Sequence, residues 1–262
     1  MPSYVVTGAA RGIGFEFIKQ LSADSGNILF AVVRNKSTAT KLAALPGNNI
    51  TVLEADVTDV KALNAAASEV SKATGGKLDY LINNAALMNH PGFTLDQFPS
   101  PEAVEKDLLD HFKVNAVGVV HTTNAFLSLL RNGSTKKVIT LSTGLADAEF
   151  TVLAEAAGEP SYSISKAAVN MIVAKYAAQF KGEGFTFLAL SPGLVNTSIS
   201  APTAEELEEH KMLGKAIAKI APDFKGPITP EESVKMQLEV INRWTVKDTG
   251  AFVSHFGNKQ WL

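Results

Sequence analysis

The chain has 262 residues, of which 46% are hydrophobic and 19% are charged, and its formal net charge is −2. This balance excludes a strongly basic surface, so we expect neither nucleic acid nor an anionic membrane as a partner. The sequence contains no cysteine, which excludes disulfides, thiolate nucleophiles and thiolate metal sites.

Short β-like runs alternate with longer helical stretches along the chain. The expected strands are Tyr4–Thr7, Ile28–Val33, Ile50–Glu54, Leu78–Ile82, Lys137–Leu141, Thr186–Leu190 and Ala251–Ser254. The expected helices are Ile13–Leu21, Lys61–Ala73, Ala103–Leu130, Pro160–Phe180 and Glu231–Asn242. Alternation at this rhythm predicts βαβ units. We therefore expect one α/β domain over residues 1–262, with a mainly parallel sheet of seven strands and helices on both faces.

Two stretches depart from the alternation. Residues 88–101 are rich in proline, glycine, asparagine and aromatic side chains, and residues 196–226 follow the sixth strand with an acidic, helix-like piece. Long loops beyond strand ends are where open α/β sheets bind ligands. We expect the second stretch to act as a substrate loop or lid, although both could be plain surface excursions.

No apolar run approaches the roughly 18 residues that a membrane-spanning helix needs. The first residues, Met1-Pro2-Ser3, lead directly into an apolar strand, so we expect no leader peptide. A cytoplasmic protein is the expectation that follows.

A glycine-rich turn follows the first strand, in the segment Thr-Gly-Ala-Ala-Arg-Gly-Ile-Gly at positions 7–14. Glycine lets the backbone approach a pyrophosphate closely, and the N-terminus of the next helix offers unpaired N–H groups. A strand, a turn and a helix in this order are the context that a dinucleotide site requires, although a glycine cluster alone can be a tight turn. We expect Gly8, Arg11, Gly12, Ile13 and Gly14 to hold the phosphates.

The end of the second strand indicates which dinucleotide is bound. An Asp or Glu there bonds the ribose hydroxyl of NAD, whereas an Arg accommodates the 2′-phosphate of NADP. Here the strand ends Val33-Arg34-Asn35-Lys36, and the sequence shows no carboxylate within reach. Arg34, with Arg11, therefore favours NADP(H), although Arg34 could simply cap a solvated strand end.

Tyr162 and Lys166 lie four residues apart, so they share one face of the expected helix. Lowering a tyrosine pKa from near 10 to near 7 takes roughly 4 kcal/mol. One ammonium about 4 Å away supplies roughly that much at an effective dielectric near 20. The pair therefore predicts a phenol that transfers a proton near neutral pH.

Together these segments resemble a classical short-chain dehydrogenase/reductase, with motifs in the family's order from end to end. The resemblance implies a single Rossmann-fold domain, with Asp56 and Val57 at the adenine. The Asn83-Asn84-Ala85-Ala86 run is similar to the family's Asn-Asn-Ala-Gly, and it implies cofactor contacts at Asn84 and Ala85. The nicotinamide carboxamide is expected to meet a group of residues after the sixth strand, namely Pro192, Gly193, Val195 and Thr197.

The resemblance also implies a catalytic tetrad. Tyr162 exchanges the proton of the alcohol, Lys166 lowers the tyrosine pKa and bonds the nicotinamide ribose, and Asn115 holds a relay water. The fourth member is a hydroxyl that orients the carbonyl. The family usually has Ser-Ser at the end of the fifth strand, whereas this chain has Ser142-Thr143. Alignment selects Thr143 and chemical similarity selects Ser142, so both stay candidates, and Thr143 is preferred.

These features predict an NADPH-dependent ketoreductase, that is, a reversible alcohol dehydrogenase, acting on a small-to-medium apolar carbonyl compound. The resemblance is to the carbonyl-reductase branch used in secondary metabolism and detoxification. The alternatives are a catalytically silent NADP-binding sensor and a fold recruited for cyclisation or dehydration. The five histidines lack metal-site spacing, so no metal is expected. Apolar residues in 103–130 and 167–180 predict a homodimer or homotetramer.

Overall fold

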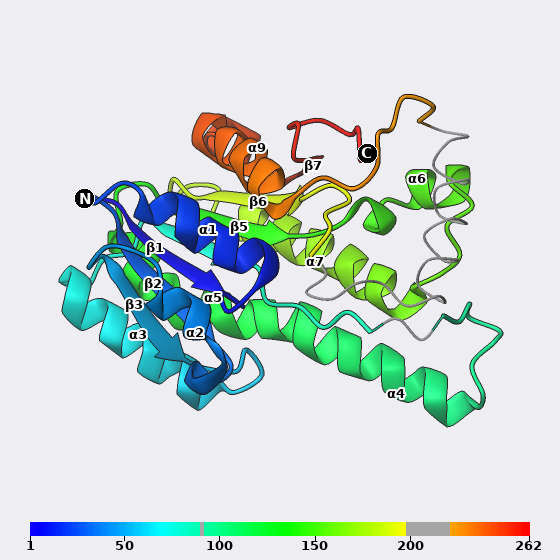
Figure 1. The fold of residues 1–262 in the computed structure, drawn as a ribbon, viewed down its shortest axis with the longest axis horizontal. Helices are drawn as coiled ribbons and strands as arrows, with labels where there is room; N and C mark the ends of the chain where they lie inside the picture. The colour runs from blue at the N-terminus through cyan, green and yellow to red at the C-terminus, as the bar shows by residue number, and fades with distance from the viewer. Residues whose placement is uncertain (90–91, 198–220) are drawn as a thin grey trace.

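The chain forms a sheet of seven strands in the order β3-β2-β1-β4-β5-β6-β7 (Figure 1). A computed structural model of the protein describes residues 1–89, 92–197 and 221–262. The strands are β1 Ser3–Thr7, β2 Ile28–Val33, β3 Ile50–Glu54, β4 Tyr80–Asn83, β5 Lys137–Leu141, β6 Thr186–Ser191 and β7 Ala251–Ser254. Each described pair of neighbouring strands is parallel. The predicted seven-stranded α/β Rossmann domain is therefore confirmed.

Helices cover both faces of the sheet. Their bounds are α1 Gly12–Ser22, α2 Thr40–Ala43, α3 Val60–Thr74, α4 Pro101–His111, α5 Gly118–Asn132, α6 Ala148–Leu153, α7 Pro160–Gln179 and α9 Pro230–Arg243. One core packs α3, α5 and α7 on one face, and a second core packs α1, α2 and α9 on the other. Alternating side chains of β1 enter the two cores, since Val5 belongs to the first and Val6 to the second.

The helix predicted over residues 103–130 is interrupted. α4 and α5 are joined by a π-helical turn, η2, over Phe112–Val117. Such turns are rare and occur frequently at functional sites. This one contains Asn115, which is fully buried. The periodicity of apolar residues did not predict the turn, which lies where the Asn115 side chain bonds Leu87 and Ser165, residues distant in the chain.

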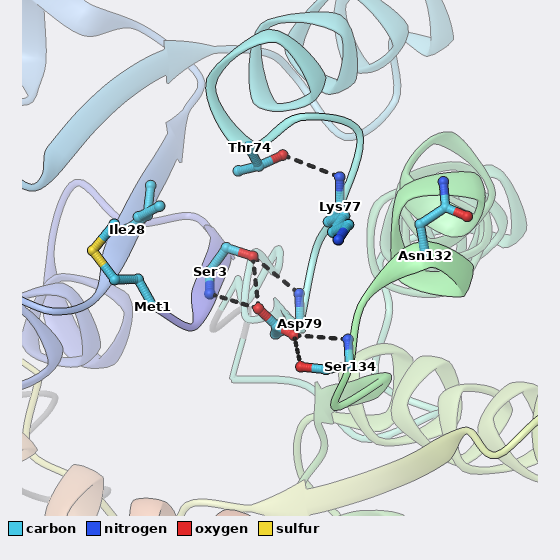
Figure 2. Close-up of a pocket in the computed structure, with 8 residues that line it drawn as sticks. All are labelled: Met1, Ser3, Ile28, Thr74, Lys77, Asp79, Asn132 and Ser134. Carbon is cyan, nitrogen blue, oxygen red and sulfur yellow. Dashed lines mark hydrogen bonds between the residues drawn. The ribbon is translucent and has the colours of Figure 1, made fainter.

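Asp79 ties together three chain segments at the amino-terminal edge of the sheet (Figure 2). Its carboxylate accepts from the N–H and hydroxyl of Ser3, at 3.0 and 3.1 Å, and from those of Ser134, at 3.0 and 2.8 Å. Burial opposes the charge of this carboxyl group, yet the bonds from Ser134 and Ser3 outweigh it and lower its pKa. The pocket beside Asp79 is therefore a structural junction whose polar groups bond one another.

Because all described strands are parallel, their carboxyl ends lie together at the edge of the sheet opposite Asp79. The loops after β1, β4, β5 and β6 consequently meet there. The loop after β6 is anchored by a parallel bridge between Val195 and Ile228, in which Asn196 N–H donates to the Ile228 carbonyl at 3.0 Å. Most of the lid expected at 196–226 lies outside the described residues. Within the described ranges, no helix combines the length and apolar character needed to cross a membrane.

Candidate active site

The glycine loop packs against the loop that follows β4. Gly8 has φ +67°, and a Cβ there would lie 2.8 Å from the Ala85 Cα, so only glycine allows this approach. Asn84 donates through Nδ2 to the Thr7 carbonyl at 2.8 Å, while Thr7 Oγ1 accepts from the N–H groups of Asn84 and Ala85, each at 3.1 Å. These bonds fix the glycine loop at the start of α1.

The N-terminus of α1 is suited to an anion. The helix begins at Gly12, its N-cap residue Arg11 makes no side-chain cap bond, and its first turn contains no acidic residue. Gly12 has φ +58°, and a Cβ there would lie 3.5 Å from Thr197 Cγ2. The loop after β1, expected to hold the phosphates, and the loop after β6, expected to meet the nicotinamide carboxamide, are therefore neighbours.

The end of β2 corrects one expectation. Arg34 is exposed, and a carboxylate does reach this loop, because Glu54 Oε2 accepts from the Lys36 N–H at 2.8 Å. The sequence could not show this, since Glu54 pairs with Val33 only once β2 and β3 are side by side. In this bond one oxygen of the Glu54 carboxylate accepts from a backbone N–H of the protein itself. Asp56 is similarly occupied, accepting from Thr58 N–H and hydroxyl at 2.8 and 2.7 Å.

Tyr162 and Lys166 lie on one face of α7, beside the end of β5. Lys166 is 3% exposed, and its Nζ donates to the Leu141 carbonyl at 2.7 Å. The same ammonium lies 5.8 Å from the centre of the Tyr162 ring. The two side chains thus lie near each other as predicted, and the bond to the carbonyl of Leu141, the last residue of β5, fixes the lysine.

The expected lowering of the Tyr162 pKa is wrong for this structure. Burial raises the pKa of Tyr162 to about 12, and the nearby Glu159 carboxylate adds to the increase. Burial also lowers the pKa of Lys166 to about 8. Desolvation is the main cause of both shifts, because it penalises the phenolate and the ammonium alike.

Asn115 connects the loop after β4 to α7. Its Oδ1 accepts from the Leu87 N–H at 2.7 Å, and its Nδ2 donates to the Leu87 carbonyl and to Ser165 Oγ, both at 2.9 Å. Ser165 in turn donates to the Tyr162 carbonyl at 2.7 Å. Sequence reasoning missed Ser165, although its position between Tyr162 and Lys166 could have suggested it. Asn115 thereby positions the segment that carries the tyrosine.

Ser142 and Thr143 face different surroundings. Ser142 is buried and donates to Asn170 Oδ1 at 2.7 Å, one helical turn beyond Lys166. Thr143 is half-buried, and its Oγ1 accepts from the Leu145 N–H at 3.3 Å, which caps the short turn η3 over Gly144–Ala146. Asn170 was not anticipated, although it lies eight residues after Tyr162 on the same helical face.

The remaining predicted cofactor residues border the same edge. Val57 and Ala85 line a small pocket together with Thr7 and Val114, which precedes Asn115. The Pro192 carbonyl accepts from Ser233 Oγ at 2.7 Å, which fixes the start of the loop that also carries Gly193 and Val195. In the described part of the chain, no three His, Asp or Glu residues are grouped as metal ligands.

The segment between Thr143 and Tyr162 contains α6. Asp147 accepts from the Phe150 N–H at 3.1 Å and so caps this helix. Val152 and Leu153 on α6 are 79% and 65% exposed. The segment that leads from Thr143 to Tyr162 therefore presents an apolar surface to solvent.

A family model described as short chain dehydrogenase matches residues 3–208. The chain is 45% identical over 273 residues to the short-chain dehydrogenase/reductase atnB of Arthrinium sp, and 42% identical over 275 residues to the short chain dehydrogenase virK of Hypocrea virens. Both alignments cover 100% of each protein.

Solved structures give the same relationship. The NADPH-bound carbonyl reductase from chicken fatty liver superposes with a TM-score of 0.81 at 28% identity, covering 98% of each chain. The carbonyl reductase Sniffer of D. melanogaster shares the fold, with a TM-score of 0.80 at 22% identity over 98% of each chain. The protein accordingly belongs to the short-chain dehydrogenase/reductase family, and it resembles the carbonyl-reductase branch.

Proposed function

We propose that the protein is an NADPH-dependent ketoreductase that reduces a small-to-medium apolar carbonyl compound. The observation that carries the proposal is the placement of half-buried Tyr162 and buried Lys166 on one face of α7, beside the end of β5 at the carboxyl-terminal edge of the sheet. The chicken carbonyl reductase, which was solved with NADPH bound, supports the choice of cofactor.

The residues present fit a dinucleotide. The close packing at Gly8 and the uncapped start of α1 suit a pyrophosphate held by Gly8, Arg11, Gly12, Ile13 and Gly14. Arg34 would meet the 2′-phosphate, Asp56 and Val57 the adenine, and Asn84 and Ala85 the middle of the cofactor. Tyr162 and Lys166 would meet the nicotinamide ribose. The carboxamide would lie against Pro192, Gly193, Val195 and Thr197. When bound, the cofactor supplies the hydride.

The chain's own groups handle the proton. A tyrosine whose pKa is about 12 keeps its proton at neutral pH, so Tyr162 is ready to donate it to a carbonyl oxygen that gains negative charge. Lys166, charged below about pH 8, stabilises the phenolate that forms. Thr143 donates a hydrogen bond to the same oxygen, and Asn115 keeps α7 in place.

The proposal is tested by the loss of NADPH absorbance with a panel of diketones, quinones and aryl ketones. An active ketoreductase consumes NADPH with at least one of them and forms the matching alcohol. If NADPH binds yet no compound is reduced, the ketoreductase proposal is contradicted, as expected for the NADP-binding sensor considered above. A cyclisation or dehydration would convert its substrate without net NADPH consumption.

Arg34→Asp is expected to weaken NADPH binding several-fold or more and to improve the relative use of NADH, because the 2′-phosphate loses a bidentate cation. Dissociation constants of both cofactors, measured by fluorescence titration, check this result. Glu54→Gln is the matched control, since its amide oxygen can keep the 2.8 Å bond to Lys36 while the nearby negative charge is removed. Unchanged NADPH affinity in Arg34→Asp contradicts the assignment.

The pH profile of carbonyl reduction is expected to fall as the pH rises through about 8. The charged form of Lys166 exists below its lowered pKa, so activity holds in acid and is lost above about 8, well before the 10.5 of an ordinary lysine. The profile of kcat/KM at saturating NADPH measures this. Lys166→Arg should be slower yet lack the alkaline fall, because guanidinium stays charged. A wild-type profile that is level to pH 10 would refute the role.

The homodimer or homotetramer and the cytoplasmic location stay predictions, as does the place in secondary metabolism. Support for self-association comes from exposed apolar side chains on the helices concerned. Leu109, Phe112 and Met171 are 59%, 45% and 60% exposed.

A further inference from the structure

The residues after β7 fold back against two loops of the site. Ser254 closes a turn in which its N–H donates to the Asn258 carbonyl at 2.7 Å and its carbonyl accepts from the Gly257 N–H at 2.7 Å. Beyond the turn, Trp261 is 6% exposed, and its ring stacks on Phe252 of β7 with centroids 4.4 Å apart. We call residues 255–262 the C-terminal brace. It lies outside the segment that the family model matches, which ends at residue 208.

The first contact of the brace is with the loop after β5. A Cβ on Gly144 would lie 2.6 Å from Trp261 Cβ and 2.9 Å from Trp261 Cγ, so the tryptophan presses directly on the residue that follows Thr143. Lys259 Nζ also lies 3.6 Å from Asp147 Oδ2. That lysine side chain is 72% exposed, so its ion pair adds little. The close packing at Gly144 is the main connection.

The second contact is with the loop after β6. A Cβ on Gly193 would lie 2.6 Å from His255 Cε1. His255 is 3% exposed, and burial lowers its pKa to about 4, so the ring is neutral at pH 7. The uncharged ring packs directly against Gly193. The brace therefore touches both the loop expected to orient substrate and the loop expected to hold the nicotinamide.

Thr143 needs such external support. It follows the last residue of β5, Leu141, by two positions, and it precedes a turn of only three residues, Gly144–Ala146. The two backbone bonds that close this turn run from Ala146 N–H to the Thr143 carbonyl at 3.0 Å and from Asp147 N–H to the Gly144 carbonyl at 2.9 Å. Displacement of a reacting group by about 1 Å can cost 10²-fold in rate. Packing against the turn from outside can therefore change the rate of catalysis by shifting Thr143.

We propose that the C-terminal brace positions the Thr143 hydroxyl toward the substrate carbonyl through the contact of Trp261 with Gly144. This inference rests on the ketoreductase function proposed above. Trp261 is a positioning residue in this scheme, because it acts through the turn that carries Thr143. His255 steadies the neighbouring loop in the same way through Gly193.

Trp261→Ala should lower kcat/KM for carbonyl reduction about tenfold, which is part of the 10²-fold that a misplaced group can cost, while the dissociation constant of NADPH changes little. Trp261→Phe should restore most of the activity, since a phenyl ring can still stack on Phe252. In a Thr143→Val background, Trp261→Ala should cost almost nothing more, because the hydroxyl that it positions is already gone. Phe185→Ala is the control, as it removes a buried aromatic ring before β6, at the opposite edge.

Gly144→Ala reaches the same contact from the other side. Gly144 has no left-handed φ, so the added methyl group is resisted by Trp261 and not by the backbone. Hydrogen exchange of the amides of residues 144–147, measured without cofactor, should accelerate in Trp261→Ala and Gly144→Ala but not in Phe185→Ala. The proposal is overturned if Trp261→Ala and Gly144→Ala both keep wild-type exchange rates and wild-type activity. It is also overturned if the losses of kcat/KM in Trp261→Ala and Thr143→Val are fully additive. An inactive wild type instead contradicts the ketoreductase function, and the exchange comparison still decides the brace.

Discussion

Tyr162→Phe is expected to bind NADPH normally and to lose carbonyl reduction by roughly 10²–10⁴-fold, the usual worth of a positioned acid. The variant keeps the half-buried ring over which Lys166 lies, at 5.8 Å, and removes only the proton donor. Fluorescence titration with NADPH and steady-state kinetics separate binding from chemistry.

Tyr176→Phe is a matched control on the same helix. Burial raises the pKa of Tyr176 to about 12 as well, and its hydroxyl donates to Asn124 Oδ1 at 2.8 Å, away from Lys166. This variant should keep near-wild-type kinetics. If Tyr162→Phe retains more than about a tenth of the wild-type rate, another group supplies the proton and the assignment is wrong.

Thr143→Val is expected to lower kcat/KM by roughly 10²-fold or more, the scale of one oxyanion-type donor, whereas Ser142→Ala should leave it within a few-fold. The hydrogen bonds of the two side chains give the reason. Ser142 uses its single donor on Asn170 Oδ1 at 2.7 Å. Thr143 Oγ1 accepts from the Leu145 N–H, which leaves its O–H free to donate to a substrate oxygen.

Stability must be separated from catalysis in this comparison. Thr143→Val also removes the cap of the turn Gly144–Ala146, and loss of a cap costs about 0.5–2 kcal/mol. Thr143→Ser keeps both the cap and the donor, so it should retain activity and serve as the control. A loss in Ser142→Ala with full activity in Thr143→Val would show that the alignment is off by one residue.

The strands and the glycine loop were predictable because their signals are local. A β-branched strand, a glycine turn and a helix follow one another within the first 22 residues, and each needs only its neighbours in sequence. Tyr162 and Lys166 share a face because four residues nearly complete one helical turn. The uninterrupted helix expected over 103–130 failed at η2, since the buried bonds of Asn115 to Leu87 and Ser165 involve residues far away in the sequence.

Residue types and their spacing alone determined the fold class, the family and the identity of the proton-transfer pair, because regular backbone hydrogen bonding imposes periods that a sequence must display. Tertiary structure decided the pKa values of Tyr162 and Lys166, since desolvation depends on which atoms replace water around each group. It also brought Glu54 to the loop after β2 and Trp261 to Gly144. No pattern in the sequence encodes these contacts, because they arise only when residues separated in the chain become neighbours in the fold.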